Sequence, residues 1–161
     1  MSEHTIRFVL NDEEVTATVS ADRRLIDLLR DDFELKGTKE GCSVGVCGAC
    51  SVLVDGVLLS SCIYPAVFVD GRSVTSIEGV ADGSDLTELQ RAFIRHGGFQ
   101  CGICTPGQII AATALLQEVP RPSEAEVRLW MMGNLCRCTG YAGIVEAILA
   151  ASGQPSDPGV G

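Results

Sequence analysis

The sequence predicts an α+β protein, in which a mixed sheet with one helix across it is followed by a bundle of helices. Hydrophobic residues alternate with period two in the first half of the chain and recur with the helical period in the second. Eight cysteines fall four to each half. We therefore expect one module over residues 1–78, a second over 79–152 and a disordered tail over 153–161.

The first module is predicted from turn signals and changes of period. A hairpin is expected over residues 5–19, with a four-residue acidic turn at its centre. A helix of about three turns should follow up to Phe33, with Ser20 or Asp22 as its N-cap. The Asp55-Gly56 pair joins two apolar runs and predicts a second hairpin. A last strand is expected within residues 72–80.

The second module is predicted as four helices from their capping residues. Helices are expected over about 85–96, from Thr105, from Ser123 to Gly133, and over about 140–152. Their capping pairs should be Asp85 with Glu88, Thr105 with Gln108, and Ser123 with Glu126. Short loops favour an up-down-up-down bundle, whose alternate loops lie at the same end. The loop with Cys101 and Cys104 should therefore meet the loop with Cys136 and Cys138.

Composition narrows the classes of function. With 21 acidic against 12 basic residues the formal charge is −9, which argues against nucleic acid as a partner. No apolar run reaches the roughly 18 residues of a membrane span, and the N-terminus lacks the pattern of a signal peptide. We expect a cytoplasmic protein without a membrane span. Because the cytosol is reducing, its eight thiols point to metal rather than to disulfides.

The cysteines form two complete ligand sets. The ferredoxin-type set is Cys42, Cys47, Cys50 and Cys62, and the bundle set is Cys101, Cys104, Cys136 and Cys138. The first set has the C-x4-C-x2-C spacing of plant-type 2Fe-2S ferredoxins, in a loop rich in glycine. Four thiolates can also hold zinc. Zinc sites rarely use the first spacing, whereas the bundle set considered alone leaves iron and zinc open.

Three segments closely resemble one known family. They are "GCSVGVCGAC", "GFQCGICTPG" and "GNLCRCTGY", and the resemblance covers about residues 3–152. The family is that of the iron-sulfur subunits or domains of molybdenum hydroxylases related to xanthine oxidase. The resemblance implies a β-grasp ferredoxin-like domain followed by a four-helix bundle, each with one 2Fe-2S cluster. Ile103 stands where the family often has an aromatic residue, which puts no ligand in doubt.

The resemblance also implies partners and a role. This chain would pass electrons singly from a molybdenum-pterin centre in a large subunit to FAD in a medium subunit, within an αβγ or (αβγ)2 complex. The overall reaction would be a water-dependent hydroxylation or oxidation of a small substrate. The pterin would be a molybdopterin, expected as its cytosine dinucleotide. Cys138 would be the cluster ligand nearest the pterin, and Gln100 would hydrogen-bond it.

Alternatives remain open from the sequence. A two-subunit relative would lack the flavin subunit and pass electrons to a cytochrome. A zinc-binding adaptor without a redox role would belong to a different class. The substrate belongs to the large subunit, so N-heterocycles, aldehydes, carbon monoxide and aromatic thioesters all remain candidates. We expect no catalytic residue and no substrate site on this chain itself.

Overall fold

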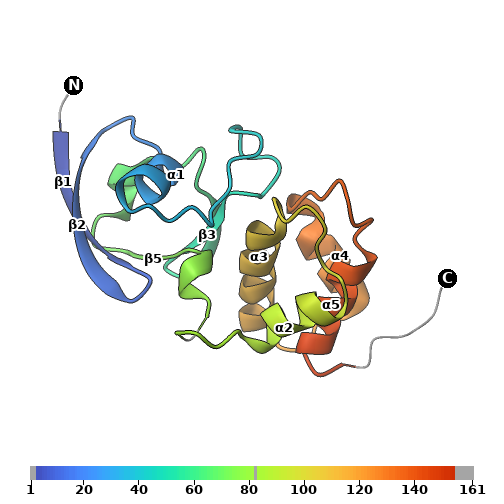
Figure 1. Cartoon of the computed structure of the whole chain (residues 1–161). Coiled ribbons are helices and arrows are strands. Elements are labelled where there is room, and N and C mark those ends of the chain that lie inside the picture. The colour runs from blue at the N-terminus through green and yellow to red at the C-terminus, as the bar shows by residue number, and fades with distance from the viewer. Residues whose placement is uncertain (1–2, 82, 155–161) are drawn as a thin grey trace.

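The computed structural model describes residues 3–81 and 83–154. Its first module is a five-stranded mixed sheet with a helix packed across it (Figure 1). The strands are β1 (Glu3–Leu10), β2 (Glu13–Ser20), β3 (Ser51–Val54), β4 (Val57–Ser60) and β5 (Ser73–Thr75), in the spatial order β2-β1-β5-β3-β4. The predicted last strand, β5, lies in the middle of the sheet, parallel to β1 and antiparallel to β3.

Both predicted hairpins are present, but the first turn is tighter than expected. Only Asn11 and Asp12 separate β1 from β2, and both have positive φ (49° and 69°). Asn and Asp tolerate this left-handed region, so two residues suffice for the turn. The acidic residues Glu13 and Glu14, predicted in the turn, instead begin β2. Asp55 and Gly56 form the second two-residue turn as predicted.

The predicted first helix is shorter than expected and has a different start. It consists of α1 (Leu25–Asp27) and a π-helical continuation, η1 (Leu28–Asp32). Neither Ser20 nor Asp22 is its N-cap, because the chain is still extended at Arg24. The Leu25 and Ile26 N–H groups donate instead to backbone oxygens of the segment after β4, which satisfies them without a side-chain cap.

Strand β3 joins the two modules because both of its faces are buried. Val52 and Val54 point into the core between the sheet and the α1–η1 helix. Leu53 points the other way and packs against Ile110 and Ala114 of the bundle. A strand with period-two alternation can belong to two cores only when both faces are covered. This explains why all four residues of β3 are buried.

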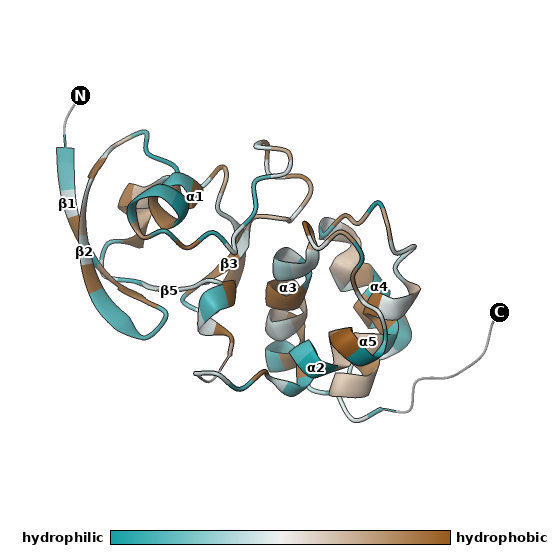
Figure 2. Ribbon diagram, in the orientation of Figure 1, coloured by the Kyte–Doolittle hydropathy of each residue, from teal (hydrophilic) through white to brown (hydrophobic). Residues whose placement is uncertain are grey.

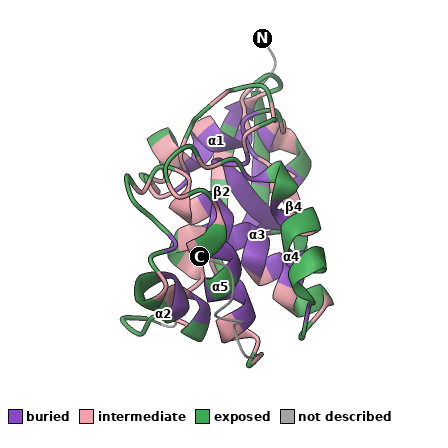
Figure 3. Cartoon of the chain, turned by 90° about the vertical axis from the view of Figure 1, so that its right-hand side faces the viewer, coloured by how far each residue is buried: buried purple, intermediate pink, exposed green. Residues whose placement is uncertain are grey.

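The second module contains the four predicted helices. They are α2 (Glu88–Arg95), α3 (Thr105–Glu118), α4 (Glu124–Trp130) and α5 (Ala142–Ala151). Three short 3-10 segments, η2 (Ala66–Val69), η3 (Ile77–Gly79) and η4 (Met131–Gly133), complete the elements. Figure 2 shows hydrophobic residues along α3 and α5, and Figure 3 shows α3 buried beside the sheet while α4 is largely exposed.

Two of the three predicted capping pairs are wrong. Helix α2 is capped by Thr87 with Gln90 in a complete capping box, rather than by Asp85 with Glu88. Helix α3 already includes Thr105, and no side chain caps it. The Gln108 side chain is used elsewhere, as described below. The pair Ser123 and Glu126 forms the predicted capping box of α4.

The bundle has the predicted connectivity. Helix α2 packs against α3 and α5, and α4 packs against the same two helices, so the four helices form a ring. The α2–α3 and α4–α5 loops consequently lie at the same end of the bundle (Figure 1). Within residues 3–81 and 83–154, no helix is long and apolar enough to cross a membrane. The predicted disordered tail falls outside the described residues from position 155 onward.

Candidate iron-sulfur centres

The ferredoxin-type set lies in the loop between η1 and β3 and just after β4. Cys50 and Cys62 are buried and pack together against Ile26 of the helix. Cys42 and Cys47 are half-buried at the outer side of the same loop. The loop can fold back on itself because Gly45 and Gly48 have positive φ (76° and 71°). A Cβ at Gly41 would lie 2.9 Å from the Cys47 Sγ.

Backbone N–H groups surround the outer sulfur of this set. The N–H groups of Val46 and Cys47 each lie 3.4 Å from the Cys42 Sγ. Hydrogen bonds from the Val44, Cys47 and Val46 N–H groups lower the pKa of Cys42 to about 6. Burial, followed by the neighbouring Cys50 thiol, raises the pKa of Cys62 to about 11. The loop therefore stabilises negative charge on its outer side, where donors to thiolate sulfur are gathered.

The bundle set is gathered by the two neighbouring loops. Cys101 and Cys138 are exposed, and their sulfurs lie 3.6 Å apart. Cys104 and Cys136 are half-buried, and their thiols interact with each other. Burial, then the contact with Cys136, raises the pKa of Cys104 to about 12. The up-down-up-down arrangement thus brings together four thiols that are distant in sequence.

One thiol of the bundle set has a side-chain donor. The Thr139 hydroxyl lies 3.1 Å from the Cys136 Sγ, and the Thr139 N–H lies 3.5 Å from it. Burial acts to raise the pKa of Cys136, but these hydrogen bonds lower it below its ordinary value. The charge on this inner sulfur is therefore stabilised by the loop that carries it.

The thiols associate in pairs rather than around one point. The pairs are Cys42 with Cys47, Cys50 with Cys62, Cys101 with Cys138, and Cys104 with Cys136. Two sulfurs bound tetrahedrally to one metal at about 2.3 Å are about 3.8 Å apart, close to the Cys101–Cys138 separation. In the part of the chain that the structure describes, no three His, Cys, Asp or Glu side chains are grouped to hold one ion. Two sulfurs on each of two irons are what four cysteines supply to a 2Fe-2S cluster, so the four residues of each set suit such a cluster.

A buried amide joins the two loops. Asn134 Nδ2 donates to Gly48 O (3.0 Å), Ser51 Oγ (3.2 Å) and Gly107 O (3.1 Å). Its backbone oxygen accepts from Gln108 Nε2 at 2.7 Å. The next residue, Leu135, donates its N–H to Cys47 O at 2.8 Å. These contacts place the ferredoxin-type loop directly against the bundle loop.

Several residues that contact a cysteine or connect the two loops were not predicted from the sequence to do so. Gln108 was predicted to be part of a capping box, and Asn134, Thr139 and Tyr141 were not assigned a role. The available signal was the position of these residues within the cysteine motifs "CTPGQ" and "NLCRCTGY". Gln100, predicted to contact a pterin, is exposed beside the exposed Cys101.

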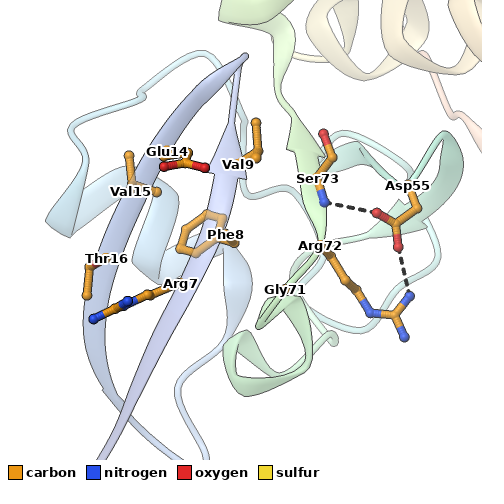
Figure 4. A pocket seen from close by; sticks show the side chains of 10 residues that line it. All are labelled: Arg7, Phe8, Val9, Glu14, Val15, Thr16, Asp55, Gly71, Arg72 and Ser73. Carbon is orange, nitrogen blue, oxygen red and sulfur yellow. Dashed lines mark hydrogen bonds and ion pairs between the residues drawn. The ribbon is translucent and has the colours of Figure 1, made fainter.

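Figure 4 shows the residues that line a cavity of about 650 Å³ in the first module. It is lined by residues of β1 and β2, by residues 71–73 at the start of β5 and by Asp55 of the second hairpin turn. Asp55 closes one side by accepting from the Ser73 N–H at 2.9 Å and from Arg72 at 3.0 Å. None of the residues that line it is a cysteine, so it is not part of the candidate centres.

Comparison with known proteins identifies the family. Residues 8–73 match the model of a 2Fe-2S iron-sulfur cluster binding domain, and residues 76–149 match that of a [2Fe-2S] binding domain. The chain is 47% identical over 128 residues to the xanthine dehydrogenase iron-sulfur-binding subunit of Escherichia coli, covering 78% of this chain and 79% of that protein. This chain belongs to the iron-sulfur subunits of the xanthine oxidase family of molybdenum hydroxylases.

Two further relatives agree with this assignment. The nicotine 6-hydroxylase small subunit of Paenarthrobacter nicotinovorans is 49% identical over 145 residues, covering 90% of this chain and 87% of that protein. The crystal structure of quinoline 2-oxidoreductase from Pseudomonas putida 86 superposes with a TM-score of 0.91 at 42% identity and covers 94% of each chain. This iron-sulfur subunit is therefore an electron-transfer part of an oxidoreductase complex.

Proposed function

We propose that this iron-sulfur subunit carries electrons one at a time from a molybdenum-pterin centre in a large subunit to FAD in a medium subunit. The ferredoxin-type set and the bundle set would each hold one 2Fe-2S cluster through all four cysteines. Such a cluster supplies a one-electron carrier, so a two-electron oxidation of substrate is divided into single steps. The paired arrangement of the thiols supports this assignment.

The observation that carries the proposal is the hydrogen bond from the Leu135 N–H to Cys47 O (2.8 Å). Leu135 directly precedes Cys136, so this hydrogen bond joins the backbone of Cys47, a ligand of one set, to the residue next to a ligand of the other. The Asn134 side chain holds this connection in place from a buried position. This contact supports transfer of electrons between the two sets in series.

The exposed ends of the two sets supply the proposed entry and exit. At the bundle end, Cys101, Cys138 and Gln100 are exposed, and we assign this face to the pterin. In this arrangement Cys138 is the ligand nearest the pterin and Gln100 hydrogen-bonds it. At the other end, the exposed apolar side chains of Val44 and Val46 border the Cys42 loop. We assign that apolar rim to the flavin-binding subunit, in an αβγ or (αβγ)2 complex.

Metal analysis of the purified complex tests the first part of the proposal. Four irons and four sulfides per chain are expected, with two distinct S = 1/2 EPR signals on reduction. Stoichiometric zinc in place of iron would support the adaptor function instead. FAD is expected in the purified complex, as the electron acceptor. A cytochrome in place of FAD would show that electrons leave this chain for the cytochrome instead.

Rapid reduction by substrate tests the order of the two centres. In the intact complex, Cys138→Ser should stop electrons before the ferredoxin-type set, because serine is a harder and more basic ligand than thiolate. Cys47→Ser should leave the bundle signal reducible and block only the flavin. Reduction of molybdenum should persist in both variants. Wild-type rates of flavin reduction in both would show that the proposed path is wrong.

A further inference from the structure

The Thr139 side chain is oriented by a closed set of hydrogen bonds around Cys136. The Tyr141 N–H donates to Thr139 Oγ1 at 3.2 Å, and the Cys136 N–H donates to the Tyr141 hydroxyl oxygen at 2.9 Å. Because the threonine oxygen accepts from Tyr141, its own hydrogen is left to point at the Cys136 Sγ, 3.1 Å away. The hydroxyl is therefore a fixed donor rather than a rotating one.

Maintaining this arrangement has a conformational cost. Tyr141 has φ = 71°, a left-handed conformation that is unfavourable for a residue with a Cβ. Such a conformation persists where surrounding contacts enforce it, and here the Tyr141 N–H and hydroxyl both belong to the network around Cys136. Among residues 3–81 and 83–154, Cys136 is the one cysteine whose sulfur accepts from a side-chain hydroxyl.

We propose that the Thr139 hydroxyl raises the reduction potential of the bundle centre. This inference rests on the proposed function, in which the bundle set holds a 2Fe-2S cluster. Reduction adds one electron and no proton, so negative charge on the ligating sulfurs increases. A hydrogen-bond donor at a sulfur stabilises the reduced form more than the oxidised form, since the interaction grows with that charge.

Thr139 contacts the bundle ligand that lies beside the connection to the ferredoxin-type set. It acts on Cys136, the ligand next to Leu135 and hence to the connection with Cys47. The outward ligands Cys101 and Cys138 accept no hydrogen bond from a hydroxyl among the described residues. Thr139 is thus a positioning residue that favours reduction of the bundle centre. It acts at Cys136, on the side from which the electron would leave for the ferredoxin-type set.

Replacing Thr139 by valine in the intact complex tests the proposal, because valine keeps the shape and removes the hydroxyl. An EPR-monitored redox titration should show the bundle signal reduced about tenfold less readily at a given potential, a fall in midpoint of about 59 mV for one electron. The ferredoxin-type signal should stay at its wild-type midpoint. Thr139→Ser, which retains the donor, should restore most of the bundle midpoint.

A matched control is Thr113→Val, which removes a hydroxyl that donates to Ile109 O within α3 and contacts no cysteine. It should leave both midpoints unchanged. If Thr139→Val lost iron, Thr139→Ala would be titrated instead, with the same expected fall. An unchanged bundle midpoint, an equal shift of both signals, or no recovery in Thr139→Ser would overturn the proposal. Absence of two 2Fe-2S signals from the wild-type complex would instead overturn the proposed function beneath it.

Discussion

Replacing Asn134 by alanine is expected to loosen the contact between the two cysteine loops without unfolding the chain. The residue is 3% exposed, and the two hydrogens of its side-chain amide serve three acceptors in the ferredoxin-type loop, β3 and α3. Gly48 O would keep its hydrogen bonds from the Ser51 N–H and hydroxyl. The stability lost in Asn134→Ala therefore comes from the missing hydrogen bonds and packing contacts, and not from buried polar groups left without a partner.

The magnitude follows from this count. Two to three hydrogen bonds at about 1 kcal/mol each, with the lost contacts of a buried side chain, give about 2 to 4 kcal/mol. Domains of this size are stable by about 5 to 15 kcal/mol, so the variant should still fold. The cost should appear locally, because the amide holds one loop against the other. The hydrogen bond from the Leu135 N–H to Cys47 O should be weakened most by this change.

Hydrogen exchange measures this local effect. Since about 1.4 kcal/mol is a factor of ten, the Leu135 amide should exchange about 30- to 700-fold faster in Asn134→Ala. The control is Asn11→Ala, which removes two hydrogen bonds to Ser76 within the first module. That variant should leave Leu135 exchange unchanged. Equal acceleration in both variants, or none in Asn134→Ala, would refute the assigned role of the amide.

Two further predictions concern the contact between the modules and the capping of α4. In Gly107→Ala the new Cβ would overlap Gly48 O, so urea unfolding should show a free energy of unfolding lower by about 1 to 3 kcal/mol, despite the better helix propensity of alanine. The control is Gly133→Ala, whose new Cβ meets nothing within 4 Å and should be tolerated. Equal losses in the two variants would contradict the steric argument. For the N-cap of α4, Ser123→Ala should lower the free energy of unfolding by about 1 kcal/mol at neutral pH, and Ser123→Asp should restore it. The Ser123 hydrogen bonds hold the pKa of Glu126 below its ordinary 4.5, so their stabilisation is present above that pH and declines as the pH falls through the lower folded value. A cost of Ser123→Ala that did not shrink in acid would show that Glu126 takes no part.

The sequence was sufficient to predict the α+β class, both hairpins, four helices and the division of the cysteines. These features depend on local rules, namely period, turn residues and ligand spacing. The errors were local as well, at helix starts where two candidates competed. Thr87 with Gln90 prevailed over Asp85 with Glu88, and long-range backbone acceptors replaced a cap before Leu25. Neighbouring residues alone cannot rank such alternatives.

The sequence by itself therefore determined which residues are available as ligands and which family the chain resembles. Only the tertiary structure decided how the two sets are connected. Asn134 lies 86 residues from Gly48 in sequence, and Leu135 meets Cys47 only because β3 buries one face on the bundle. No periodicity encodes such a contact, since it depends on two modules packing together. The same packing turned Gln108 from a predicted cap into a buried donor to the Asn134 backbone.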